Sequence, residues 1–140
     1  MREAGPLDGP AVVLLHGWTA NAALNWFAAI EPLAAAGYRV IAPDHRGHGH
    51  GIRSTARFRL IDCADDVAAL CEVLGIDRAV MVGYSMGGPI AQLLWQRHRE
   101  LVEGLVLCAT AARFRNARSE RVPGGVVSGL SLIHISEPTR

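Results

Sequence analysis

Four short runs of apolar residues recur along the chain. They cover residues 11–15, 38–42, 79–82 and 104–108. Each run is too short for a typical helix and lacks polar alternation, which is typical of strands that are buried on both faces. Between the runs, helical spacing predicts helices over residues 22–36, 61–74 and 87–98, the first of them interrupted or restarted at Pro32.

The second predicted helix shows the amphipathic spacing most clearly. Its apolar residues at i, i+3, i+4 and i+7 are Val67, Leu70, Cys71 and Leu74. This stripe is expected to pack against a sheet, while Asp65, Asp66 and Glu72 face water. Buried strands that alternate with helices imply right-handed crossovers. The pattern therefore predicts an α/β fold: a mostly parallel sheet of about four strands with helices on both faces.

Composition is that of a single globular domain. The chain has 140 residues, half of them hydrophobic, and a formal net charge of +1. These values argue against disorder and against a nucleic-acid partner. No run is long enough to span a membrane and no secretory signal is evident, so we expect a cytoplasmic protein. Cys63, Cys71 and Cys108 lack metal-site spacing and are expected to be buried free thiols.

The loop after the third apolar run carries the clearest chemical motif. Residues 83–87, Gly-Tyr-Ser-Met-Gly, match G-x-S-x-G between a predicted strand and a predicted helix. Gly83 and Gly87 would give clearance to Ser85 on a sharp bend, and Gly88 would let the helix approach the sheet. A structural glycine turn and a nucleotide loop are the weaker alternatives. Ser85 stands where a dinucleotide motif needs glycine, and the chain has no lysine for a P-loop.

Three motifs together resemble the α/β-hydrolase family over roughly residues 5–115. They are His16-Gly17 after the first run, Asp44-His45-Arg46-Gly47-His48-Gly49 after the second, and residues 83–88. The resemblance implies that Ser85 is the nucleophile and that the backbone N–H groups of Trp18 and Met86 form an oxyanion hole. It also implies that His16 braces loops rather than acting as the base. Branches of the family that need a carboxylate at the bend, such as epoxide hydrolases, are disfavoured by Ser85.

The loop after the second run invites a metal-site interpretation, which we consider weaker. Asp44, His45, His48 and His50 lie on a glycine-rich loop rather than at i, i+4 on a helix, and we expect no metal. The resemblance implies that Asp44 and Arg46 are structural. In the family a serine closely follows the last glycine, whereas here residues 51–53 intervene before Ser54. The path of this loop is therefore left open.

A serine nucleophile needs a histidine and an acid, and the resemblance implies that both follow it in the chain. The acids and histidines after Ser85 are Glu100, Glu103, Glu120, Glu137, His98 and His134. None fits, since His98 is expected at the far end of the third helix. Residues 130–140 resemble a translated sequencing adaptor, so we expect a truncated core over residues 1–129 and no native domain in residues 130–140. Alone, this chain is expected to be inactive and poorly soluble, with an exposed edge strand at 104–108.

The predicted function is that of a serine hydrolase acting on an ester, lactone or other acyl bond of a small molecule, without a cofactor. Acyl transfer and cofactor-free perhydrolysis remain open, because an acyl-enzyme accepts whichever nucleophile reaches it. A ligand-binding protein that keeps the fold without turnover also remains open.

Overall fold

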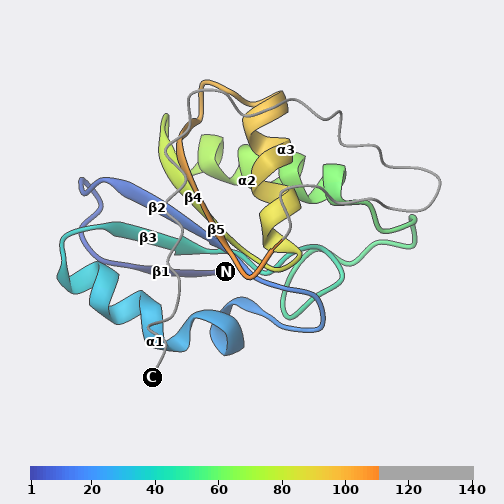
Figure 1. The fold of residues 1–140 in the computed structure, drawn as a ribbon, viewed down its shortest axis with the longest axis horizontal. Helices are drawn as coiled ribbons and strands as arrows, with labels where there is room; N and C mark the ends of the chain where they lie inside the picture. Colours follow the sequence, from blue (N-terminus) through green and yellow to red (C-terminus); the bar gives the residue numbers. More distant parts are fainter. Residues whose placement is uncertain (111–140) are drawn as a thin grey trace.

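The computed structural model describes residues 1–110, which form one sheet flanked by three helices (Figure 1). In chain order the elements are β1 (Arg2–Ala4), β2 (Ala11–Leu15), α1 (Ala22–Ala35), β3 (Arg39–Ala42), α2 (Leu60–Val73), β4 (Ala79–Tyr84), α3 (Gly87–Arg97) and β5 (Val102–Cys108). The strand order is β1-β3-β2-β4-β5. Strands β3, β2, β4 and β5 run parallel, so the predicted α/β fold is confirmed.

Helices cover both faces of the sheet, as predicted (Figure 1). Along β2, Val12 and Leu14 pack with α1, whereas Val13 and Leu15 pack with α2 and α3. Successive side chains on a strand point to opposite faces, so one apolar strand contributes to both cores. This explains why the apolar runs show no polar alternation.

The structure adds a fifth strand that the sequence did not predict. Strand β1 pairs antiparallel with β3, with Arg2 opposite Ala42. Its residues are exposed or half-buried. Three mostly polar residues carry no periodicity signal, and the strand exists because β3 offers an unpaired edge.

Helix α1 corrects a second expectation, because it continues through Pro32 rather than stopping there. Proline cannot donate to the carbonyl group one turn earlier, which here belongs to Ala28. Ala28 and Pro32 both lie on the exposed side of the helix. Water can therefore satisfy that carbonyl, while buried Trp26 and Ile30 hold the opposite side against the sheet.

The acidic side of α2 is also less exposed than predicted. Glu72 is exposed, but Asp65 and Asp66 are half-buried and form ion pairs with Arg97 and Arg46. Hydrophobic spacing identifies the face that packs on the sheet. It does not detect arginines that reach the neighbouring face from other elements.

None of the three cysteines, Cys63, Cys71 and Cys108, forms a disulfide within the described residues. Cys63 and Cys71 are buried, but Cys108 is only half-buried. Burial raises the pKa of the Cys71 thiol to about 11. Cys108 ends β5, which within residues 1–110 has a neighbouring strand on one side only, as expected for an edge strand.

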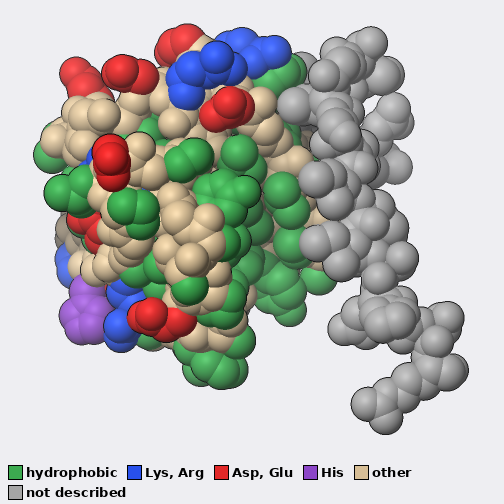
Figure 2. All heavy atoms as spheres, turned by 90° about the vertical axis from the view of Figure 1, so that its left-hand side faces the viewer, with side chains coloured by type: hydrophobic (Ala, Val, Ile, Leu, Met, Phe, Trp, Pro, Cys, Tyr) green, Lys and Arg blue, Asp and Glu red, His purple; other side chains and the backbone are tan. Residues whose placement is uncertain are grey.

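Figure 2 shows apolar side chains gathered across the middle of one side of the molecule. Among the described residues, Leu24 and Phe27 on α1 are 65% and 75% exposed.

No helix in residues 1–110 is both long and apolar enough to cross a bilayer. Several predictions from the sequence concern residues outside the described part of the chain: the segment 130–140, Glu120, His134 and Glu137.

Candidate active site

Ser85 occupies the sharp bend between β4 and α3. Its φ of +50° is in the left-handed region, which side chains other than glycine rarely adopt. A residue held there costs on the order of 1–3 kcal/mol and persists only where its surroundings force the conformation. The bend places Ser85 at the carboxyl end of a parallel sheet, where such folds bind ligands.

The surrounding glycines allow this bend because there is no room for side chains. A Cβ added at Gly83 would collide with the carbonyl group of Gly87. A Cβ at Gly87 would collide with the carbonyl group of Leu15, and one at Gly88 would collide with the side chain of Thr110. The glycines of the motif therefore stand at the positions before and after Ser85 where neighbouring parts of the chain come too close for a side chain.

Hydrogen bonds from the end of β5 hold the backbone of Ser85. The Ser85 N–H donates to the Cys108 carbonyl at 3.0 Å. The Ser85 carbonyl accepts from the Gly88 N–H at 3.0 Å and from the Thr110 hydroxyl at 2.8 Å. Sequence reasoning did not identify Thr110, because no motif links it to Ser85.

The loop after β2 lies directly beside Ser85. Strands β2 and β4 are neighbours, with Leu15 opposite Gly83, so the residues that follow each strand meet. A Cβ on Gly17 would lie only 3.3 Å from the Cβ of Ser85. The Gly17 N–H donates to Asn25 Oδ1 at 2.9 Å, which ties this loop to the first turn of α1.

The predicted oxyanion donors come from these two adjacent loops. Trp18 follows Gly17, and Met86 is the N-cap residue of α3. Within residues 1–110, neither of their backbone N–H groups has a hydrogen-bond acceptor. The N-terminus of a helix also favours negative charge, so the Met86 amide lies at a position suited to an oxyanion.

His16 is fully buried and both of its ring nitrogens are used. Nε2 accepts from the His45 N–H at 3.0 Å, so Nδ1 carries the proton and donates to the Gly17 carbonyl at 2.8 Å. Burial lowers the pKa of His16. These contacts suit a residue that braces the loops after β2 and β3.

Asp44 organises the loop whose path the sequence left open. Its carboxylate accepts from the Ala22 N–H at 2.7 Å and from the His50 N–H at 2.9 Å. Burial opposes ionisation of Asp44, but these two amide bonds, together with the nearby charges of the N-terminus and His16, outweigh it and lower the pKa of the carboxyl. Arg53 closes the loop by donating to the carbonyls of Gly47 and Gly49.

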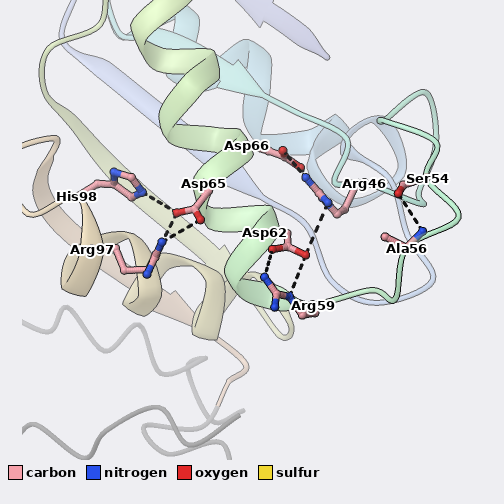
Figure 3. A network of polar contacts seen from close by, with 9 residues as sticks. All are labelled: Arg46, Ser54, Ala56, Arg59, Asp62, Asp65, Asp66, Arg97 and His98. Carbon is pink, nitrogen blue, oxygen red and sulfur yellow. Dashed lines mark hydrogen bonds and ion pairs between the residues drawn. The ribbon is translucent and has the colours of Figure 1, made fainter. Parts of the chain in front are cut away.

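Arg46 leaves this loop and binds α2 (Figure 3). Its guanidinium donates to both carboxylate oxygens of Asp66, at 2.7 and 2.6 Å. Asp62 lies 3.7 Å from the same guanidinium and also pairs with Arg59. These bonds fasten the loop to α2, which packs on the sheet, and such contacts suit a structural residue.

Three histidine rings near this loop lie close together: the centroid of the His16 ring is 4.3 Å from that of His45 and 5.4 Å from that of His48. His45 is buried, which lowers its pKa to about 3 with a further contribution from neighbouring His16 and His48. The His48 and Trp18 rings meet edge to face, with their centroids 5.2 Å apart. The His50 side chain is 95% exposed. Within the described residues, no group of three or more His, Cys, Asp or Glu side chains could hold a metal.

His98 lies away from Ser85, at the opposite end of α3. Its Nε2 is 2.8 Å from Asp65 Oδ1, and Arg97 binds the same carboxylate (Figure 3). Ser85 precedes the first turn of α3, whereas His98 is the C-cap. The structure therefore does not bring His98 to the nucleophile position.

A serine on a strand-to-helix bend, with the Met86 amide on the bend and the Trp18 amide on the neighbouring loop both lacking acceptors within residues 1–110, is typical of proteins with an α/β-hydrolase core. The sequence profile described as alpha/beta hydrolase fold matches residues 10–129. The chain belongs to this family.

The proteins similar to this chain include some named as esterases and one named as a magnesium-chelatase subunit. The chain is 45% identical over 91 residues to the magnesium-chelatase 30 kDa subunit of Rhodobacter capsulatus, covering 64% of this chain and 31% of that protein. It is 39% identical over 87 residues to the bifunctional esterase/perhydrolase DCH of Acinetobacter calcoaceticus, covering 62% and 31%. A thermophilic esterase from Thermogutta terrifontis superposes with a TM-score of 0.76 at 35% identity, covering 82% of this chain and 41% of that structure. The chain thus spans about a third of the length of these two curated relatives.

Proposed function

We propose that the whole protein is a serine hydrolase that cleaves an ester, lactone or other acyl bond of a small molecule, without a cofactor. The observation that carries the proposal is the strained bend at Ser85, whose φ is +50°, next to the amides of Trp18 and Met86. A side chain is held in this conformation only where the surroundings force it, and a nucleophile must project from the backbone to reach a substrate.

In the proposed reaction, Ser85 Oγ attacks the carbonyl carbon while a histidine takes its proton. The carbonyl oxygen becomes an oxyanion, which accepts hydrogen bonds from the Trp18 and Met86 N–H groups. The intermediate collapses, the leaving alcohol takes the proton from the histidine, and an acyl-serine remains. Water then attacks this ester with the same histidine as base, which releases the acid and restores Ser85.

Within residues 1–110, no histidine forms a hydrogen bond with the Ser85 hydroxyl. His48 Nδ1 lies 3.1 Å from the Arg46 carbonyl oxygen, and the His50 side chain is 95% exposed. His16 and His45 are buried between loops, and His98 pairs with Asp65 at the far end of α3. We therefore propose that the histidine and the acid of the triad lie in sequence outside residues 1–110. This fits a chain that spans about a third of the length of its curated relatives.

The proposal is tested in the whole protein with p-nitrophenyl esters and a fluorophosphonate probe. Ser85→Ala should lower kcat by about 10⁴–10⁶-fold and abolish labelling. Ser54→Ala is the matched control, because Ser54 lies on an exposed loop and, within residues 1–110, its hydroxyl is hydrogen-bonded only to the Ala56 amide, at 3.1 Å. Turnover or labelling that survives in Ser85→Ala would overturn the proposal.

A second candidate is a member of the family that binds a small molecule without turnover. It is favoured by the 45% identity to a protein named as a magnesium-chelatase subunit rather than as a hydrolase. The fluorophosphonate probe separates the two functions, since only an activated serine reacts. Perhydrolysis or acyl transfer at Ser85 would instead give labelling together with a different product when peroxide or an alcohol is supplied.

A further inference from the structure

We propose that Thr110 is a positioning residue that orients and polarises the backbone amide of Met86. The inference rests on the proposed function, in which that amide stabilises the oxyanion. It concerns a residue on β5's outgoing loop, outside all three motifs of the sequence.

Thr110 contacts the nucleophile bend at two points. Its hydroxyl donates to the Ser85 carbonyl at 2.8 Å, and its side chain fills the space that a Cβ on Gly88 would need. The approach depends on a turn at Ala109, whose φ is +47°. Because Cys108 accepts the Ser85 N–H at 3.0 Å, the end of β5 holds both the amide and the carbonyl of Ser85.

The link from Thr110 to the oxyanion site runs through one peptide group. The Ser85 carbonyl and the Met86 N–H belong to the same planar trans unit, so the two bonds point in opposite directions. Donors that hold the carbonyl towards α3 therefore aim the Met86 N–H away from the helix. The N–H then points out beyond the N-terminal end of α3, which is where a helix favours an anion.

The same hydrogen bond also strengthens the amide as a donor. A peptide whose carbonyl accepts hydrogen bonds becomes more polarised, and its N–H becomes a better donor. The Ser85 carbonyl accepts from both the Gly88 N–H and the Thr110 hydroxyl. Removing the hydroxyl leaves one donor in place, so the bend should survive while its amide is less polarised and less firmly aimed.

Two substitutions separate the hydroxyl from the shape of the side chain. Thr110→Val keeps the volume that packs on Gly88 but cannot donate, whereas Thr110→Ser keeps the donor. In ester hydrolysis by the whole protein, we expect Thr110→Val to lower kcat by about three- to tenfold, which is the equivalent of one neutral hydrogen bond. KM should stay within about twofold, because the oxyanion forms only in the transition state. Thr110→Ser should retain most of the wild-type kcat.

A spectroscopic readout reports on the amide directly, without turnover. Residues 1–140 contain three methionines, Met1, Met81 and Met86, so labelling the whole protein with [¹⁵N]methionine gives few amide signals from this part of the chain. We expect Thr110→Val to shift the Met86 amide proton upfield and Thr110→Ser to leave it near its original position. Met81, which lies within β4, is the internal control and should not move.

The outcomes distinguish the two proposals. An unchanged kcat in Thr110→Val, or an unmoved Met86 signal in a folded Thr110→Val chain, would overturn the role of Thr110 while leaving Ser85 as the proposed nucleophile. Equal losses in Thr110→Val and Thr110→Ser would show that packing rather than donation matters, which also overturns it. Activity that survives in Ser85→Ala would instead refute the proposed function.

Discussion

Replacing Gly87 by alanine sets two physical effects against each other. Gly87 is the first residue of α3, and a Gly→Ala change within a helix ordinarily stabilises it by about 1 kcal/mol. The added Cβ, however, would lie 2.7 Å from the Leu15 carbonyl carbon and 3.0 Å from the Leu15 Cβ, and would collide with the Leu15 carbonyl oxygen. Leu15 belongs to β2, which has a strand on either side.

The steric effect should exceed the gain in helix propensity. The obstacle is backbone, so no side-chain rotation removes it, and α3 would have to move away from β2 by several tenths of an ångström. That movement would disturb Ile90 and Leu94, which are fully buried beneath the helix. Overpacking costs about 1–3 kcal/mol, and we place this case at the upper end. After the propensity gain is subtracted, Gly87→Ala should lower the free energy of unfolding by about 2 kcal/mol.

Urea unfolding of the whole protein measures this change, read as a lower midpoint at an unchanged slope. Gly104→Ala is the matched control, because among residues 1–110 a Cβ there would meet only Val80 Cγ2, at 3.9 Å, and φ is not positive. This control should be neutral or slightly stabilising. Equal or greater stability of Gly87→Ala relative to the wild type would refute the steric reasoning.

Two further predictions concern the loop after β3. Arg46→Met removes the two-bond ion pair with Asp66; the two side chains are 21% and 26% exposed, respectively. This change should lower the free energy of unfolding, measured by urea titration, by about 1–2 kcal/mol. Arg46→Lys should recover less than half, since an ammonium cannot bind both oxygens in the same planar geometry. Because burial lowers the pKa of His45 to about 3, the unfolded chain binds this proton first, and stability should fall as the pH drops from about 6.5 towards 3. His45→Asn should make that slope shallower, and equal slopes in wild type and His45→Asn would contradict this.

Much of the fold could be predicted because burial leaves a local record in the sequence. The four apolar runs correspond to β2, β3, β4 and β5, with bounds that differ by at most two residues at either end. The glycines around Ser85 were predictable for a similar reason, since the sharp bend that they permit involves only neighbouring residues. By contrast, β1 and the passage of α1 through Pro32 depend on an available strand edge and on solvent at Ala28, and neither leaves a periodic pattern.

The amino-acid sequence by itself determined which segments are buried, where the chain bends sharply, and which serine stands at that bend. Only the tertiary structure decided what surrounds that serine: the insertion of β2 between β3 and β4 brings Gly17 against Ser85, and β5 brings Thr110 to its carbonyl. The physical reason is that periodicity records whether a residue is buried, whereas contacts between distant loops depend on strand order and register. Those follow from the packing of all elements together.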